Sequence, residues 1–267
     1  MQALHPHARA SLIRWLVFFI VLATGIALVV WWRDNRAAAP SAIRTQQTAV
    51  NSQTSSFDKK RYSLNDPTSL WVVVNKGRVL PSGFVPAHLV VPRVVLSEGS
   101  AAENMQLRSE AAAALEKLNT AASADGVGLM LVSGYRSYST QQTVYSGYAN
   151  SQGQGYADST SARPGHSEHQ TGLAADLGST TGKCQLDKCF GDLVEGKWLA
   201  DNAYKYGFII RYQKDKTSLT GYDYEPWHLR YVGTDLAAEI NKAGQTLEQF
   251  FALPAYTDYP AQMVELM

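Results

Sequence analysis

Two histidines, an aspartate and a glutamate are the residues whose types and spacing point to chemistry in this chain. His169 and Asp176 lie in the run from Ser167 to Asp176, and Glu225 and His228 follow about 50 residues later. Imidazole and carboxylate groups suit Zn²⁺, and three such ligands leave a fourth position for the water of a hydrolytic reaction. The glutamate stands three residues before the second histidine and can take the proton from that water. The pattern predicts a single catalytic zinc site.

Turns and strands around these residues would bring them together. Gly172 permits a tight turn or a close backbone approach between the first histidine and the aspartate. Residues 173–177 are predicted to form a strand, with the aspartate on one of its faces. Residues 227–232 are predicted to form another strand, on which His228 and Arg230 share a face. We therefore expect the ligands to come from one turn and two strands.

The pattern Ser-x-His-x-x-Gly-x-Ala-x-Asp followed by Glu-x-x-His resembles the signature of the D-alanyl-D-alanine metallopeptidases. These are the carboxypeptidases and dipeptidases of the VanY and VanX type, within a larger group that includes lysostaphin-like peptidases and hedgehog signalling domains. Other blocks are similar to the family in the same order: residues 133–137 with Gln142 downstream, 202–208 and 225–233. The resemblance extends over roughly residues 70 to 251.

The resemblance implies three ligands for one Zn²⁺ ion: His169, Asp176 and His228. It implies Glu225 as the catalytic base, and Arg136 as the group that holds the substrate carboxylate or the developing oxyanion. A guanidinium suits that task because it stays charged and can grip a carboxylate with two hydrogen bonds. Ser167 and Gln142 would be secondary substrate contacts. The competing interpretations are a structural ion pair for Arg136, a turn for Ser167, and a helix cap of the form Ser139-x-x-Gln142.

The N-terminal part of the chain predicts a membrane anchor. Residues 15–32 form a stretch of 18 residues without a charge, close to the roughly 20 that span a bilayer. Tryptophans stand at both of its ends, as they do at bilayer interfaces. Residues 1–14 would then be a cytoplasmic tail. The alternative is a cleaved signal peptide with residues 37–39 as the cleavage region. Either interpretation exports the rest of the chain.

Residues 33–62 are predicted to be a flexible linker, because small and polar residues dominate them and large apolar residues are few. Residues 63–267 would form the catalytic domain, with an α+β fold. The resemblance implies a small central antiparallel sheet with flanking helices. Strands are expected at residues 71–74, 127–132, 208–212 and 227–232. Helices are expected after a capping box at residues 100–103 and over residues 140–149, 194–206 and 234–242.

The cysteines are consistent with export, and the net charge bears on the class of partner. Cys184 and Cys189 are the two cysteines of the chain, and in an oxidising compartment they would form a disulfide that closes a small loop. The rival interpretation is a metal-binding pair, although no further cysteine completes a thiolate site. A formal net charge of +1 gives no electrostatic case for nucleic acid as a partner.

Together these features predict a zinc-dependent D,D-carboxypeptidase, anchored by a single pass in a bacterial cell membrane with its catalytic domain extracytoplasmic. It would remove the C-terminal D-alanine from peptidoglycan stem peptides. The alternatives are an L,D-carboxypeptidase that acts on tetrapeptide stems, a peptidoglycan endopeptidase, and, from a different class, a non-catalytic wall-binding module. The Ser-x-x-Lys motif of serine carboxypeptidases occurs at residues 56–59, but it lies in the predicted linker without a supporting Lys-Thr-Gly, so we attribute it to chance.

Overall fold

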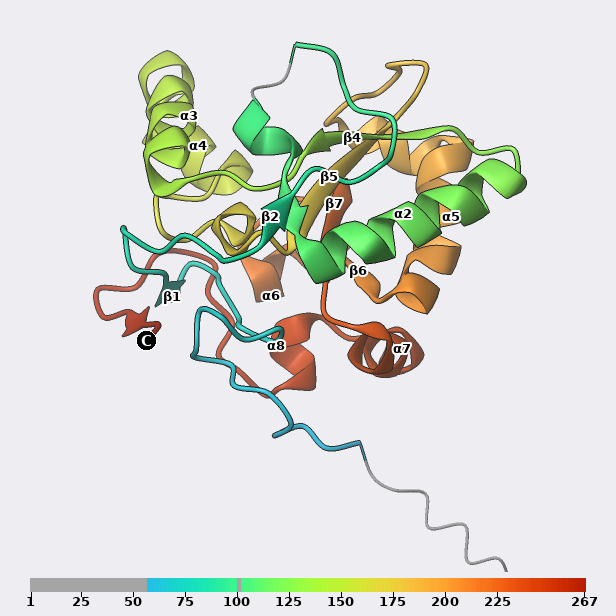
Figure 1. The fold of residues 1–267 in the computed structure, drawn as a ribbon. Helices are drawn as coiled ribbons and strands as arrows, with labels where there is room; N and C mark the ends of the chain where they lie inside the picture. Colours follow the sequence, from blue (N-terminus) through green and yellow to red (C-terminus); the bar gives the residue numbers. More distant parts are fainter. Residues whose placement is uncertain (1–56, 100–101) are drawn as a thin grey trace, which may run out of the picture. The chain divides into compact units, whose positions relative to one another are not determined.

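The computed structural model describes residues 57–99 and 102–267 (Figure 1). The predicted tail (1–14), the predicted span (15–32) and most of the predicted linker lie outside these residues. Across the part of the chain that the structure describes, no helix is long and apolar enough to cross a membrane.

The last residues of the predicted linker are ordered on the domain. The Phe57 ring stacks on Trp71 with 5.5 Å between centroids, and Tyr62 meets the same indole edge-on at 5.0 Å. Trp71 is buried, and its ring nitrogen donates a hydrogen bond to the carbonyl of Val232. The domain therefore begins by residue 57, because these two aromatic side chains find apolar partners there.

A four-stranded antiparallel sheet forms the centre of the domain, as the resemblance implied. Its strands lie in the order β4 (Leu129–Ser133), β5 (Ala174–Ser179), β7 (Glu225–Tyr231) and β6 (Phe208–Tyr212). Two short pairs lie outside this sheet: β1 (Arg78–Val79) with β8 (Val264–Glu265), and β2 (Leu89–Val90) with β3 (Leu107–Arg108).

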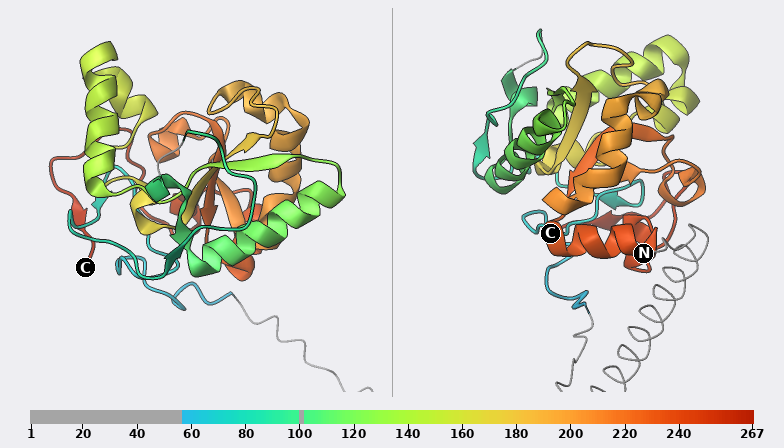
Figure 2. Two further views of the ribbon diagram at one scale, coloured as in Figure 1. Left: turned by 45° about the horizontal axis from the view of Figure 1, so that its top comes forward. Right: turned by 90° about the vertical axis from the view of Figure 1, so that its right-hand side faces the viewer.

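Helices flank the sheet on several sides. They are α2 (Ser109–Ala124), α3 (Tyr138–Gln152), α4 (Gln154–Thr160), α5 (Val194–Asn202), α6 (Thr217–Thr220), α7 (Thr234–Ala243) and α8 (Leu247–Phe250). Short 3-10 turns occur at η1 (Ala102–Met105), η2 (Glu168–Thr171), η3 (Lys188–Asp192) and η4 (Ala203–Tyr206). Both views in Figure 2 show α3 and α4 packed together at the end of the sheet away from α2.

The alternation of side chains along the central strands separates a core face from a polar face. Leu177 of β5 and Leu229 of β7 point into the main apolar core, where α2 contributes Leu115 and Leu118. Because successive strand residues point to opposite faces, the even-numbered neighbours on β5 and β7 lie on the other side of the sheet. That other side carries the predicted aspartate and second histidine, as the spacing required.

Several predicted elements are confirmed by the structure. The predicted helix over residues 194–206 is α5 followed by η4, and Gly207 ends it in the left-handed conformation with φ of 87°. The strand at residues 208–212 is β6, and the helix at residues 234–242 is α7. The disulfide joins Cys184 to Cys189, which excludes the metal-pair interpretation.

The strand predicted at residues 71–74 is wrong, although all four residues are buried. Arginine side chains, in place of a neighbouring strand, satisfy carbonyls of this segment. Arg78 Nε donates to the carbonyl of Val73 at 2.8 Å, and Arg230 Nη2 donates to that of Val72 at 2.8 Å. An apolar run thus indicated burial correctly, but it did not indicate strand pairing.

Two predicted helix starts are also wrong. Residues 100 and 101 of the predicted capping box lie outside the described residues, and the residues that follow form the 3-10 turn η1 and the strand β3 before α2 begins at Ser109. Glu103 instead accepts a hydrogen bond from the backbone N–H of Ser137 at 2.8 Å. Ser137, and not Ser139, is the N-cap of α3, and its hydroxyl accepts from the N–H of Thr140.

Substitution of Leu118 by alanine tests the core that supports the sheet. Leu118 is fully buried, so Leu118→Ala is expected to lower the free energy of unfolding by about 3 kcal/mol through lost burial and a residual cavity. Urea denaturation measures the change. The neighbouring Lys117→Ala on the exposed face of α2 is the matched control, and a similar loss in both variants would contradict this assignment of the core.

Candidate active site

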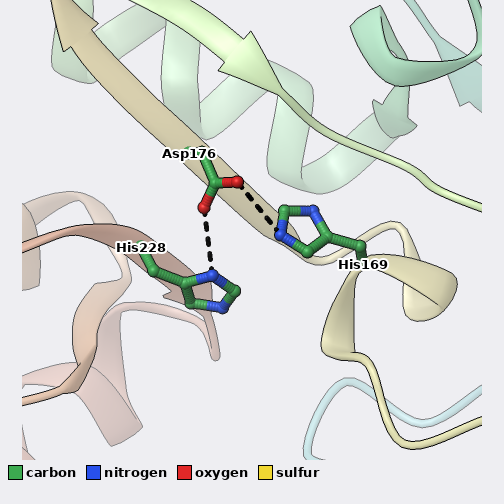
Figure 3. A group of neighbouring side chains, drawn as sticks. All are labelled: His169, Asp176 and His228. Atoms are coloured by element: carbon green, nitrogen blue, oxygen red, sulfur yellow. Dashed lines mark ion pairs between the residues drawn. The ribbon is translucent and has the colours of Figure 1, made fainter. Parts of the chain in front are cut away.

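His169, Asp176 and His228 converge on the polar side of the sheet (Figure 3). His169 comes from η2, Asp176 from β5 and His228 from β7, where the last two are direct partners in the antiparallel register. The Asp176 carboxylate lies 3.2 Å from Nε2 of His169 and 3.0 Å from Nδ1 of His228. Each of the three residues is only 4% exposed. The structure therefore unites the three predicted metal ligands.

Gly172, in the left-handed conformation, forms the turn between His169 and Asp176. Gly172 ends η2 with φ of 67°, and its N–H donates to the carbonyl of His169. A Cβ atom at this position would lie 3.0 Å from the Leu89 side chain and 3.3 Å from the backbone nitrogen of Arg108. Both the positive φ and the crowding require glycine, which confirms the role predicted for it.

The first histidine has a defined tautomer. Nδ1 of His169 lies 2.6 Å from the carbonyl oxygen of Gly134. A carbonyl can only accept, so Nδ1 carries the proton and Nε2 presents its lone pair toward Asp176. Metal-binding histidines are usually oriented in this way by an acceptor behind the ring.

The donor set fits zinc. Oδ1 of Asp176 is buried and lies 3.0 Å from Nδ1 of His228, but among the described residues it accepts no hydrogen bond of good geometry. The ligand atoms of the triad lie within 4.8 Å of one another. Two imidazole nitrogens and one carboxylate form a ligand set of the kind found in catalytic zinc sites, where three protein ligands leave a position for water or substrate. His169, Asp176 and His228 can therefore hold the one Zn²⁺ ion that was predicted.

Glu225 lies beside the triad at the first position of β7. Its Oε2 atom is 3.7 Å from Nδ1 of His228, and its side chain is mostly buried. Burial raises the pKa of Glu225 to about 8, against the opposing attraction of His228. A carboxyl group with a pKa near neutrality can both accept and release a proton at physiological pH. The structure thus brings Glu225 beside the three predicted ligands, and its role as the catalytic base stays a prediction.

Arg136 follows β4 and faces the same site. Its Nη1 donates to Oε1 of Gln141 at 2.9 Å, and its Nη2 donates to Oγ of Ser133 at 3.0 Å. The distance from Nη2 to the Asp176 carboxylate is 3.9 Å, so the competing interpretation of a structural ion pair has only a long contact in its support. Neutral side chains hold the guanidinium in place, and its charge points into the site.

The other two predicted contacts occupy different surroundings. Ser167 is 4% exposed and lines the same cleft as the triad. Gln142 is exposed on α3, whereas its neighbour Gln141 is buried and holds Arg136. The substrate contact at Gln142 stays a prediction, and the residue that sequence reasoning missed is one position away. The helix start at residue 138 decides which glutamine points inward, and the local sequence favoured the wrong cap.

Glu168 is a further residue that the sequence analysis missed. It precedes the first ligand, is 1% exposed, and its Oε2 atom lies 3.6 Å from Nε2 of His228. The one available signal was an acidic residue between two positions that the motif assigned to the site.

The triad opens into a cleft of about 540 Å³. Helices α3 and α4 contribute Tyr148 and Tyr156 to its lining, and the loop closed by the disulfide contributes Leu186 and Lys188. The Nζ atom of Lys188 forms an ion pair at 2.8 Å with Asp223, two residues before the candidate base. The volume falls within the range typical of ligand-binding clefts, about 300–1,000 Å³.

Comparison with known proteins identifies the family. The family model described as VanY, D-alanyl-D-alanine carboxypeptidase, matches residues 104–234. The putative carboxypeptidase YodJ of Bacillus subtilis is 40% identical over 235 residues, which cover 82% of this chain and 86% of the relative. The chain belongs to the VanY family of D-alanyl-D-alanine carboxypeptidases.

Solved structures similar to this chain agree with the fold, and one of them holds zinc. The LdcB LD-carboxypeptidase superposes with a TM-score of 0.67 at 45% identity and covers 70% of this chain and 87% of that one. A VanY D,D-pentapeptidase from a VanB-type vancomycin resistance cassette, in complex with Zn(II), gives 0.54 at 34% identity, with coverages of 67% and 97%. This VanY-family chain is a zinc metallopeptidase of the carboxypeptidase type.

Zinc affinity is expected to increase with pH. Burial lowers the pKa of His228, but its contacts with Asp176 and Glu168 outweigh that effect and raise the pKa to about 9. Below that pH a proton must leave the ring before Nδ1 can bind a metal, so each pH unit between 6 and 8 is predicted to increase affinity about tenfold. Titration of metal-free protein against a chromophoric chelator at several pH values measures this slope. A pH-independent affinity would contradict the role of His228 as the ligand that loses a proton.

Proposed function

We propose that this VanY-family enzyme is a D,D-carboxypeptidase that removes the C-terminal D-alanine from peptidoglycan stem peptides. The observation that carries the proposal is the placement of Glu225 and Arg136 beside the three zinc ligands in one cleft. A candidate proton acceptor and a positively charged side chain that can bind the substrate carboxylate thus flank one metal site. This arrangement favours a catalyst over a non-catalytic wall-binding module.

Zinc and Glu225 would have separate roles in the hydrolysis. When bound by the triad, Zn²⁺ supplies a Lewis acid that activates water and polarises the scissile carbonyl. Glu225 takes a proton from the attacking water as its oxygen bonds to the carbonyl carbon. As the carbon–nitrogen bond breaks, the same carboxyl group returns that proton to the leaving amine of D-alanine. Its raised pKa suits both steps.

Arg136 would bind the C-terminal carboxylate of the substrate. Its guanidinium can form two parallel hydrogen bonds with a terminal carboxylate, a geometry that a lysine could not reproduce. Ser133 and Gln141 keep the guanidinium aimed at the triad. Recognition of a free C-terminus supports a carboxypeptidase over an endopeptidase. The extent of the cleft beyond the triad supports a longer peptide over a dipeptide as substrate.

L,D-carboxypeptidase activity on tetrapeptide stems is the second candidate. The LdcB LD-carboxypeptidase is 45% identical to this chain, compared with 34% for the VanY D,D-pentapeptidase. The triad, Glu225 and Arg136 act on the peptide bond and on the terminal carboxylate, and both substrates contain these groups. The choice between them therefore depends on how the cleft receives the residue before the terminal D-alanine.

We also propose that the enzyme works outside the cytoplasm, attached to the membrane through residues 15–32. The disulfide supports an oxidising compartment, since such bonds are rare in cytosolic proteins. The uncharged stretch near the N-terminus supports attachment. Fractionation of cells that express the full chain tests this proposal, and recovery of the intact protein in the soluble cytosolic fraction would contradict it.

Substitution of Glu225 separates catalysis from metal binding. Glu225→Gln is expected to lower kcat by about 10²–10⁴-fold because proton transfer is lost, while zinc content stays at one ion per chain. Steady-state kinetics and elemental analysis measure the two quantities. The exposed Glu265→Gln serves as a control with the same chemical change, and near-normal turnover of Glu225→Gln would refute the assignment of the base.

Matched stem peptides decide the substrate. The protein is incubated with a stem pentapeptide and a stem tetrapeptide, with and without a chelator, and the products are identified by mass spectrometry. Chelator-sensitive loss of one alanine from the pentapeptide alone is the expected result. Loss from the tetrapeptide would establish the L,D activity instead. Cleavage of neither peptide by zinc-loaded protein would refute both carboxypeptidase activities.

A further inference from the structure

The carboxylate of Glu168 lies at the centre of a buried cluster of charges behind the metal site. Its Oε1 atom accepts hydrogen bonds from Nε of Arg211 and Nη1 of Arg230, both at 2.8 Å. The side chains of all three residues are fully buried. Burying a carboxylate is costly unless it is paired and hydrogen-bonded, and the two guanidinium groups supply both conditions on this side.

The other oxygen of Glu168 faces a metal ligand. Oε2 lies 3.6 Å from Nε2 of His228. Both atoms are buried, and among the described residues neither has a hydrogen-bond partner at shorter range. A buried polar atom without a partner costs roughly 1–3 kcal/mol. Two such atoms that face each other are most simply explained as a donor and an acceptor that act together.

We infer that Glu168 is a positioning residue for the metal site: it holds the proton on Nε2 of His228, so that Nδ1 is the ring nitrogen that binds the cation. The inference rests on the proposed zinc site and adds a residue to it. An ionised carboxylate can only accept, so the ring nitrogen that faces it must donate. The opposite nitrogen then points to Asp176, at 3.0 Å.

The surrounding arginines hold one oxygen of Glu168. Oε1 accepts from both Arg211 and Arg230, so Oε2 is left facing His228. Arg211 also binds the carboxylate of Glu248 with two hydrogen bonds, at 2.6 and 3.0 Å. The two arginines and two glutamates of the cluster balance in charge.

Glu248 provides a matched control. It is buried, as Glu168 is, and it pairs with the same Arg211 and with the amide of Asn75. Within residues 57–99 and 102–267, no hydrogen bond or ion pair joins Glu248 to His228. Removing its charge disturbs the same cluster without touching the histidine. A purely structural role for Glu168 would therefore make the two substitutions equivalent.

The test compares Glu168→Gln with Glu248→Gln in the full chain, stripped of metal and titrated with zinc against a competing chelator. In Glu168→Gln the amide oxygen can still accept from the arginines, which turns the NH₂ group toward His228 and opposes a proton on Nε2. We expect its zinc affinity to fall about 10–100-fold. Glu248→Gln should stay within about threefold of wild type. An equal fall in both variants would overturn the inference.

The tautomer of His228 is a second readout, independent of activity. Long-range ¹H–¹⁵N spectra of the zinc-loaded protein should show the proton on Nε2 in wild type and in Glu248→Gln. An unchanged His228 signal together with unchanged zinc affinity in Glu168→Gln would overturn the inference. Thermal unfolding of the metal-free variants confirms that they fold. Should Glu168→Gln not fold, Glu168→Asp keeps the charge and lengthens the contact, and a weakened zinc affinity is again expected.

The same titration distinguishes this inference from the proposed function. Wild-type protein that binds no zinc would overturn both, because the metal site itself would be absent. Wild-type protein that binds zinc and cleaves stem peptides, together with normal zinc binding by Glu168→Gln, would overturn the positioning role alone.

Discussion

The pairing of β5 with β7 is the constraint on which the rest of the site depends. In this register Asp176 lies opposite His228, while Leu177 and Leu229 enter the core on the reverse face. A slip of one residue would turn the ligands into the apolar core and the leucines toward the cleft. The hydrophobic packing that stabilises the sheet therefore also fixes the distance between two metal ligands, and a separate device for that purpose is unnecessary.

Beside these strands, arginine side chains bond the carbonyls of residues 72 and 73, which have no strand partner within the described part of the chain. Arg230 binds Glu168 with one part of its guanidinium and the carbonyl of Val72 with another. It thereby ties the segment before the first helix to the polar side of the sheet. Buried charges are costly when unpaired, and their mutual satisfaction here produces a firm support for the metal ligands.

Sequence reasoning reached the residues whose role depends on local period and spacing. The ligand triad, Glu225, Gly172 and the face shared by His228 and Arg230 all follow from short motifs or from strand alternation. It failed where a residue's role depends on partners that are far away in the sequence. Glu103 looked like a capping residue and bonds a loop 34 positions away, and the apolar run at residues 71–74 is buried without a strand partner. The partners of Glu168 lie more than 40 positions away, which no local pattern encodes.

The shape of the cleft depends on whether the disulfide between Cys184 and Cys189 has formed. Leu186 and Lys188 line the cleft, and their loop is closed covalently by the disulfide. A cross-link removes conformations from an open chain. The conformations of this loop at the edge of the cleft are therefore restricted only once the thiols have been oxidised. Oxidative maturation would then be the step that completes the substrate-facing surface, whereas the metal ligands, carried by strands and a helical turn, need no such step.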